Sequence, residues 1–275
     1  MLYNTAPDAL FTPQTAVDPL GFGKVAVVTG CSSGIGLAVT QHLLAHQFQV
    51  CGLDMAAFDY NLVREADHGR FHFHRGDLTA PGACEEGVRI CVAAYGPRID
   101  VLVNVAGLMD NFSSADAVTD DLWDRVLAVN LTVPVKMMRA VIPFMRAKKD
   151  GCIVNVASTA ATSGAVAGVA YTSSKHGLIG ATKNVAWRFR EEGIRCNAVL
   201  PGGIDSSIGN VIARGEQKEV DGVSSPVHAL QTKPSVSAPM ITPLEVAKTI
   251  VFLISDQART ISGVSLPVDK AWGVV

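Results

Sequence analysis

TGCSSGIG, residues 29–36, is the stretch that decides the fold of this chain. It follows directly on the β-branched run Lys24–Thr29 (KVAVVT), which predicts a strand buried on both faces. A helix is predicted over Leu37–His46, and a second buried strand over Gln49–Leu53 ends at Asp54. The order of strand, glycine-rich turn, helix, strand and acid is that of the first unit of a dinucleotide-binding fold.

The glycines of this stretch have the spacing GxxxGxG. Glycine lets the backbone approach a pyrophosphate, whose negative charge meets the positive end of the following helix. The alternative, a plain tight turn, explains less, because a strand precedes the glycines and a helix follows them. We therefore predict that the turn binds a dinucleotide cofactor through Gly30, Ser32, Ser33, Gly34, Ile35 and Gly36.

Asp54 stands where an acid can accept hydrogen bonds from both ribose hydroxyls of the cofactor. A carboxylate there repels the additional phosphate of NADP, and Ser33 supplies no positive charge to hold that phosphate. The sequence thus favours NAD(H) over NADP(H). Arg64 or Arg75 would reverse this preference if the fold brought either one close to Asp54.

Strands and helices continue to alternate along the rest of the chain. Further strands are predicted at Phe71–Arg75, Ile99–Asn104, Cys152–Val156, Ile194–Leu200 and Gly263–Pro267, and helices at Gly82–Ala94, Thr119–Met145, Gly168–Glu191 and Pro243–Ser255. Pro134 should bend or divide the long third helix. This alternation predicts an α/β single-domain Rossmann fold, a doubly wound parallel sheet of about seven strands flanked by helices.

Two segments fall outside this pattern. Residues 1–22 hold three prolines and are predicted to be an irregular N-terminal arm ahead of the domain at 23–275. The stretch of about 204–241 mixes polar residues with short apolar pieces. A long irregular stretch within a compact domain is typical of a functional lid, so we predict that it covers the substrate.

Polar and small residues follow the predicted third and fourth strands, at the carboxyl edge where ligands bind in open α/β sheets: Asp77, Asn104, Ala106 and Gly107. On the long helix beginning near residue 168, Tyr171 and Lys175 stand four residues apart and share one face. A neighbouring ammonium favours the phenolate, so the pair could act as a general acid and base. By itself, such a pair is also common on solvated helix faces.

Taken together, the motifs give a specific match. The chain resembles a classical short-chain dehydrogenase/reductase in TGCSSGIG (29–36), Asp54, DL (77–78), NVAG (104–107), VN (129–130), VAS (156–158), YTSSK (171–175) and PGGIDS (201–206). These pieces fall in the order and spacing of that family between about residues 24 and 268. Three positions depart from it: Val105 replaces an Asn, Ser206 replaces a Thr, and Val268-Asp269-Lys270-Ala271 stands where Asp-Gly-Gly is common.

The resemblance implies an active site of four residues. Tyr171 would donate or accept the hydroxyl proton, and Ser158 would hydrogen-bond the substrate oxygen. Lys175 would lower the pKa of Tyr171 and bind the nicotinamide ribose, while Asn130 would hold a water that links Lys175 to solvent. The resemblance adds cofactor contacts from Leu78, Tyr171, Lys175, Pro201, Gly202, Ile204 and Ser206.

Composition limits the partners and the location of the protein. The formal net charge of -2, without a basic patch, argues against nucleic acid. The six cysteines form no CxxC pair and most lie in apolar runs, which predicts buried free thiols and a reducing, cytoplasmic location. No uninterrupted apolar run of about 18 residues predicts a membrane helix. His72 and His74 could face the same way, but no third ligand is evident, so no metal site is predicted.

We therefore expect an NAD(H)-dependent oxidoreductase that acts on CH–OH groups and interconverts a secondary alcohol and a ketone. The apolar residues within 204–241 favour an apolar or cyclic small molecule as substrate. Two alternatives keep the fold: a cyclase or lyase, and a regulatory protein that binds the nucleotide without turnover. The resemblance also implies a homotetramer or a homodimer.

Overall fold

The computed structural model describes residues 20–204 and 241–274, and its centre is one parallel sheet of seven strands. The strands are β1 Val25–Thr29, β2 Gln49–Asp54, β3 Phe71–Arg75, β4 Val101–Asn104, β5 Gly151–Val156, β6 Ile194–Pro201 and β7 Ser265–Val268. Their order across the sheet is β3-β2-β1-β4-β5-β6-β7. The predicted sheet is therefore confirmed. Most of the predicted arm, and Ser206 with nearly all of the predicted lid, lie outside the described residues.

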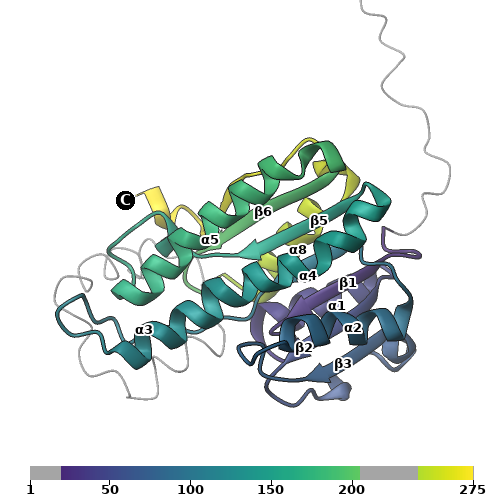
Figure 1. The fold of residues 1–275 in the computed structure, drawn as a ribbon, viewed down its shortest axis with the longest axis horizontal. Helices are drawn as coiled ribbons and strands as arrows, with labels where there is room; N and C mark the ends of the chain where they lie inside the picture. Colours follow the sequence, from purple (N-terminus) through teal and green to yellow (C-terminus); the bar gives the residue numbers. More distant parts are fainter. Residues whose placement is uncertain (1–19, 205–240, 275) are drawn as a thin grey trace, which may run out of the picture.

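Helices cover both faces of the sheet, as a doubly wound fold requires (Figure 1). The α-helices are α1 Gly34–Ala45, α2 Ala83–Tyr95, α3 Asp120–Leu127, α4 Val133–Lys148, α5 Val169–Arg188 and α8 Pro243–Ile254. Side chains of α1 and α8 form one core with the sheet, and those of α2, α4 and the end of α5 form a second core on the other face. All six cysteines are buried free thiols, as their sequence context predicted.

The strand order reverses at β1, which pairs with β2 on one side and β4 on the other. Thr29, the last residue of β1, is in register with Leu53 and with Asn104. The Thr29 hydroxyl also accepts hydrogen bonds from the backbone N–H groups of Val105 (3.0 Å) and Ala106 (3.2 Å). The glycine-rich turn and the NVAG segment therefore lie side by side at the switch point, where open α/β sheets bind ligands.

Helix α1 begins at Gly34, three residues earlier than predicted, so Gly34 and Gly36 belong to its first turn. A Cβ added to Gly36 would lie 1.9 Å from the carbonyl oxygen of Gly30. Gly30 itself has a φ of +68°, and a Cβ there would lie 2.8 Å from the backbone nitrogen of Ala106. Only glycine allows the turn, the helix and the neighbouring segment to approach this closely.

The long helix predicted over Thr119–Met145 is divided. A π-helical turn, Ala128–Thr132, joins α3 to α4, and Pro134, which has no N–H to donate, lies in the first turn of α4. Among the described residues, the run Asp120–Lys148 is the one helical segment long and apolar enough to span a membrane. Buried side chains of α4 pack in the second core, which accounts for that apolar character.

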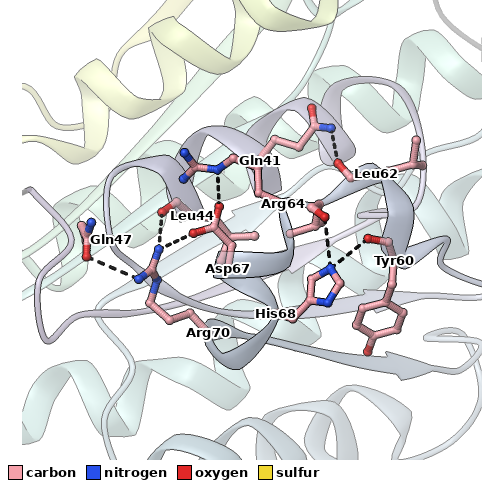
Figure 2. A network of polar contacts seen from close by, with 10 residues as sticks. Gln41, Leu44, Gln47, Tyr60, Leu62, Arg64, Asp67, His68 and Arg70 are labelled. Carbon is pink, nitrogen blue, oxygen red and sulfur yellow. Dashed lines mark hydrogen bonds and ion pairs between the residues drawn. The ribbon is translucent and has the colours of Figure 1, made fainter.

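The connection between β2 and β3 is fastened to α1 by a polar network (Figure 2). Gln41 of α1 donates a hydrogen bond to the carbonyl of Leu62, at 2.6 Å, and Arg70 donates to the carbonyl of Leu44. The buried carboxylate of Asp67 pairs with both Arg64 and Arg70. Arg64, one of the two arginines that could reverse the cofactor preference, is thus occupied by Asp67.

Trp187 of α5 lies at the surface of the described structure. Its side chain is 66% exposed, and the guanidinium of Arg190 lies 3.9 Å from the ring centroid. Stacking on a neighbouring cation stabilises an aromatic ring at the surface without burying it.

The last described turn is unusual in its backbone. Lys270 and Ala271 both adopt positive φ, at 49° and 67°, at positions where glycine is common in the family that the sequence resembles. The carboxylate of Asp269 accepts hydrogen bonds from the N–H groups of Ala271 (3.0 Å) and Gly273 (2.8 Å). These bonds hold a conformation that side chains other than glycine rarely adopt.

Residues 204 and 241 meet at the edge of the structure. An isolated parallel bridge pairs Ile204 with Ile241, and the N–H of Ile241 donates to the carbonyl of Gly203 at 3.2 Å. Ile241 is buried in the first core. The two points between which the predicted lid is inserted are therefore adjacent and anchored.

Candidate active site

Tyr171 and Lys175 lie on α5 at the carboxyl edge of the sheet, with the Lys175 ammonium 5.5 Å from the centroid of the Tyr171 ring. Lys175 is 3% exposed, and its Nζ donates a hydrogen bond to the carbonyl of Val156, the last residue of β5, at 2.9 Å. Burial lowers the pKa of Lys175 to about 8. With one acceptor among the described residues, the ammonium has two further N–H donors with which it could bind a ligand.

The pKa of Tyr171 is raised to about 12, first by burial and then by the negative charge of Asp110, while Ser158 lowers it. This direction is opposite to the lowering by Lys175 that the resemblance implies. The physical reason is that the cost of desolvating a phenolate is the largest of these effects. Deprotonation of Tyr171 therefore needs a further positive charge or a strong donor.

Ser158 follows β5 and caps the short 3-10 helix Thr159–Ala161. Its hydroxyl accepts a hydrogen bond from the N–H of Ala160 at 3.1 Å. Ser158 also forms a side-chain hydrogen bond with Tyr171, which lowers the pKa of that phenol, so the two hydroxyls lie together at the site.

Asn130 lies in the π-helical turn and is fully buried. Its amide binds Leu108 twice, accepting from the N–H and donating to the carbonyl at 2.8 Å each, and also donates to the Ser174 hydroxyl at 3.1 Å. A Cβ placed on Gly107 would lie 3.4 Å from Asn130 Oδ1 and 3.6 Å from Lys175 Nζ. The four residues implied by the resemblance thus lie around one end of α5. Short π-helical turns such as Ala128–Thr132 are frequent at functional sites.

The glycine-rich turn fits an anionic ligand. The Ser32 hydroxyl is buried, has no hydrogen-bond partner among the residues described and can donate to an anion. At the end of β4, Asn104 Oδ1 is also buried without a partner in the described part of the chain, and as an acceptor it suits a hydroxyl or N–H group of a ligand. No acidic residue occupies the first turn of α1, and Ser33 makes no capping hydrogen bond there. The start of a helix carries partial positive charge and unpaired N–H groups, which suits a pyrophosphate.

Asp54, the last residue of β2, binds the backbone of the glycine-rich turn. Its carboxylate accepts hydrogen bonds from the N–H groups of Ser32 and Ala56, at 2.9 Å each. Arg75, in register with Asp54 on β3, donates through Nε to the carbonyl of Met55 at 2.9 Å. The carboxylate is therefore held at the turn, with one arginine nearby.

A family model described as short chain dehydrogenase matches residues 24–217. The chain belongs to the short-chain dehydrogenase family. The relative "Short-chain dehydrogenase/reductase cdmF" of Talaromyces verruculosus is 50% identical over 252 residues, which cover 91% of this chain and 97% of that protein. "Asnovolin H dehydrogenase nvfC" of Aspergillus novofumigatus is 46% identical, over 91% of this chain and 97% of its own. The ligand-free aldohexose dehydrogenase AldT of Thermoplasma acidophilum superposes with a TM-score of 0.79 at 28% identity, over 94% and 96% of the two chains.

As a short-chain dehydrogenase, the protein is an oxidoreductase of small molecules that uses a nicotinamide cofactor. The remaining cofactor positions predicted for it lie along the same edge. Asp77 caps the turn after β3 and accepts from the N–H and hydroxyl of Thr79, and these bonds lower its pKa. The other residues predicted there are the buried Leu78, Pro201 at the end of β6, and Gly202 and Ile204 after it.

Two residues of this short-chain dehydrogenase escaped the sequence analysis. Asp110, after β4, binds the start of α5. The ring of Trp272 packs directly on the backbone of the PGG turn: a Cβ added to Gly203 would lie only 2.6 Å from it. A carboxylate six residues after Asn104 was the available signal for Asp110. Trp272 gave no signal, because its contact depends on the backbone conformation of the preceding turn.

A cavity of about 440 Å³ lies at the opposite, amino edge of the sheet, where charged residues such as Lys24, Asp100 and Arg195 line it. None of the predicted catalytic or cofactor residues of the dehydrogenase lines this cavity. Among the residues described, no group of three or more His, Cys, Asp or Glu side chains gathers as metal ligands do.

Proposed function

We propose that this dehydrogenase uses NAD(H) to interconvert a secondary alcohol and a ketone. The observation that carries the proposal is the convergence of Ser158, Tyr171 and Lys175 at the edge of the sheet that also holds the glycine-rich turn. A proton donor, a donor for the substrate oxygen and a ligand for the nicotinamide ribose then lie around one reacting carbon.

In the proposed reaction, the Tyr171 phenol exchanges the hydroxyl proton of the substrate, and the Ser158 hydroxyl donates to the same oxygen. Lys175 uses its remaining donors for the cofactor ribose, and its positive charge favours the Tyr171 phenolate. When bound, NAD would supply the hydride acceptor for this reaction. Asn130 would keep a water between Lys175 and solvent, from its place between Leu108 and Ser174.

The cofactor would be held by the glycine-rich turn, by Asp77 and Leu78, and by the residues after β4. Ser32 and Asn104 would use the buried oxygens that have no partner among the described residues. Ala106 and Gly107 would allow close approach at the switch point, and Pro201 and Gly202, at and directly after the end of β6, would contact the cofactor further along the same edge.

A panel of secondary alcohols and ketones tests the proposal. Purified protein should reduce NAD with at least one alcohol, or oxidise NADH with the matching ketone, and the absorbance of NADH near 340 nm measures either reaction. The substrate proposed is an apolar or cyclic molecule, and asnovolin H, for which one relative is named, is a first candidate. Cofactor binding without turnover of any substrate would contradict the proposal and favour a regulatory nucleotide-binding protein. Release of a rearranged or cleaved product without a change in NADH would favour a cyclase or lyase.

Cofactor preference gives a sharper prediction at Asp54. We expect Asp54→Ala to shift the ratio of kcat/KM for NAD over NADP by about 10- to 100-fold towards NADP, because charge-assisted bonds to the ribose are lost and repulsion of the phosphate ends. Steady-state rates with both cofactors measure this ratio. An unchanged ratio would contradict the NAD preference.

Two further variants make that result specific. Asp59→Ala removes another carboxylate from the same β2–β3 connection, and it should leave the ratio near its wild-type value. In the Asp54→Ala background, Arg75→Ala should reduce the gain with NADP, because Arg75 is the cation in register with Asp54. A gain that persists would exclude Arg75 as the phosphate ligand.

We also infer a homodimer or homotetramer and a cytoplasmic location. Val135 of α4 and Trp187 of α5 are exposed, as are Leu244 and Phe252 of α8, and apolar surface of this kind suits burial in a subunit interface. Six free thiols suit a reducing compartment. Light scattering of the purified protein measures the number of subunits, and a monomer would contradict the first inference.

A further inference from the structure

The first turn of α5 is capped by a side chain from a distant part of the chain. Gly168 occupies the N-cap position and has no side chain to bind the free N–H groups of the helix. Asp110 replaces it: Oδ1 accepts from the N–H of Gly168 at 3.0 Å, and Oδ2 accepts from the N–H of Tyr171 at 2.8 Å. Oδ1 also accepts from the N–H of Phe112 at 3.1 Å. Asp110 is 8% exposed, so these N–H groups satisfy its carboxylate.

The fit between Asp110 and Gly168 is close enough to exclude any side chain at residue 168. A Cβ on Gly168 would lie 2.5 to 2.8 Å from the three carboxyl atoms of Asp110. Gly168 has a φ of −73° and a ψ of 174°, a conformation that alanine adopts without strain. The glycine is therefore needed for the space that the carboxylate fills and not for its backbone conformation.

The same segment is fastened to α5 at a second point. The N–H of Val169 donates to the carbonyl of Ser113 at 3.0 Å. The 110–113 segment therefore binds the start of the helix through the carboxylate of Asp110 and the carbonyl of Ser113. At the other end of the segment, Asn130 joins Leu108 to the hydroxyl of Ser174. The segment after β4 thus contacts α5 on both sides of Tyr171.

We propose that Asp110 is a positioning residue for Tyr171, which fixes the start of α5 and places a negative charge at the backbone N–H of the residue that carries the phenol. The catalytic part of this inference rests on the proposed function, whereas the cap itself does not. The groups that face Tyr171 are Lys175 on its own helix, Ser158 after β5 and Asp110 after β4. Asp110 raises the pKa of Tyr171, so its charge favours the protonated phenol that a carbonyl reduction requires.

A double-mutant cycle between Asp110 and Gly168 tests the positioning role. Asp110→Ala should lower kcat by about tenfold or more and change the Kd of NADH by less than about twofold, because misplacement of a reacting group affects chemistry more than cofactor binding. Gly168→Ala should have a similar effect, because its methyl group displaces the carboxylate. In the Asp110→Ala background, Gly168→Ala should cost less than about twofold more, because the space is then empty. Independent, multiplying losses would overturn the proposal.

Asp100 provides the matched control. It is also a buried carboxylate, 4% exposed, and accepts a backbone N–H from Val25 at 2.8 Å, but it lies at the amino edge of the sheet. Asp100→Asn and Asp110→Asn should both lower the Tm. Only Asp110→Asn should lower kcat when both variants are assayed well below their Tm. Equal effects on kcat would mean that Asp110 acts only through stability.

The pH profile provides a readout that a structural role would not change. In alcohol oxidation, Asp110→Asn should move the acidic limb of kcat/KM to lower pH, because loss of the negative charge makes the phenolate easier to form. An unmoved limb, or one at higher pH, would overturn the role of the charge.

If the wild-type chain turned over no substrate, the proposed function would fail. The cycle measured in Tm would then still decide whether Asp110 and Gly168 interact.

Discussion

Tyr171→Phe is expected to lower kcat by about a thousandfold while the Kd of NADH changes by less than about twofold, since general acid–base catalysis contributes on the order of 10² to 10⁴ in rate. The substitution removes only the hydroxyl. The ring that packs near Lys175 stays in place, and so do the backbone bonds to Asp110. Steady-state kinetics in both directions, together with a fluorescence titration of NADH, measure the two effects separately.

Tyr95→Phe is the control for this result. It removes a hydroxyl that donates to the carbonyl of Val50 at 3.3 Å, on the sheet face covered by α2. It should lower stability slightly and leave kcat unchanged. A Tyr171→Phe variant that retained more than about a tenth of wild-type kcat would refute the assignment of the proton to this phenol.

Lys175→Met should abolish most activity and at the same time stabilise the protein. The pKa of Lys175, lowered from its ordinary value of 10.5 to about 8, corresponds to about 3 kcal/mol spent on holding a charged ammonium in the core at neutral pH. Loss of the hydrogen bond to Val156 costs about 1–2 kcal/mol. The net expectation is about 1–2 kcal/mol of added stability, together with a loss in kcat of about a hundredfold or more.

The pH dependence of stability identifies the origin of that gain. Because the folded-state pKa of Lys175 is depressed, the unfolded chain binds more protons than the folded chain between about pH 8 and 10.5. Wild-type stability relative to Lys175→Met should therefore rise across this window, and the advantage of the variant should be complete below about pH 8. Thermal unfolding of both proteins at a series of pH values measures this difference.

Lys183→Met, at an exposed position on the same helix, is the matched control. It should change neither kcat nor the dependence of stability on pH. If Lys175→Met unfolded at a lower temperature than the wild type at pH 7, the buried ammonium would be stabilising and the expectation would be wrong.

Much of the sheet was predictable because strands such as β1 and β4 are apolar runs buried along their length and are followed by glycine or a polar turn. Runs such as Lys24–Thr29 are typical of strands buried on both faces of a parallel sheet. The first and last residues of the helices were harder to predict from the sequence. Gly34 and Gly36 read as a turn in sequence, yet they form the start of α1, because the missing side chains allow that helix to approach Gly30.

The missed features depend on contacts between distant residues. Asp110 and Tyr171 are 61 positions apart, and nothing in the intervening sequence indicates that one caps the helix of the other. Lys270 and Ala271 adopt positive φ without the glycine that normally signals it, because Asp269 and the surrounding structure hold the turn. The exposed position of Trp187 follows from the outward face of α5, which the mixed polarity of that helix did not reveal.

The bridge between Ile204 and Ile241 has a consequence for how the protein can diverge. Because both attachment points are adjacent and joined to each other, the entropy cost of closing the chain there grows only slowly with the length that is inserted. Insertions, deletions and whole replacements between them need not disturb the sheet or the residues along its carboxyl edge. A chimaera carrying the corresponding stretch of a relative should therefore still fold. Natural selection could in the same way change which molecules are accepted while the proton-transfer machinery is inherited intact.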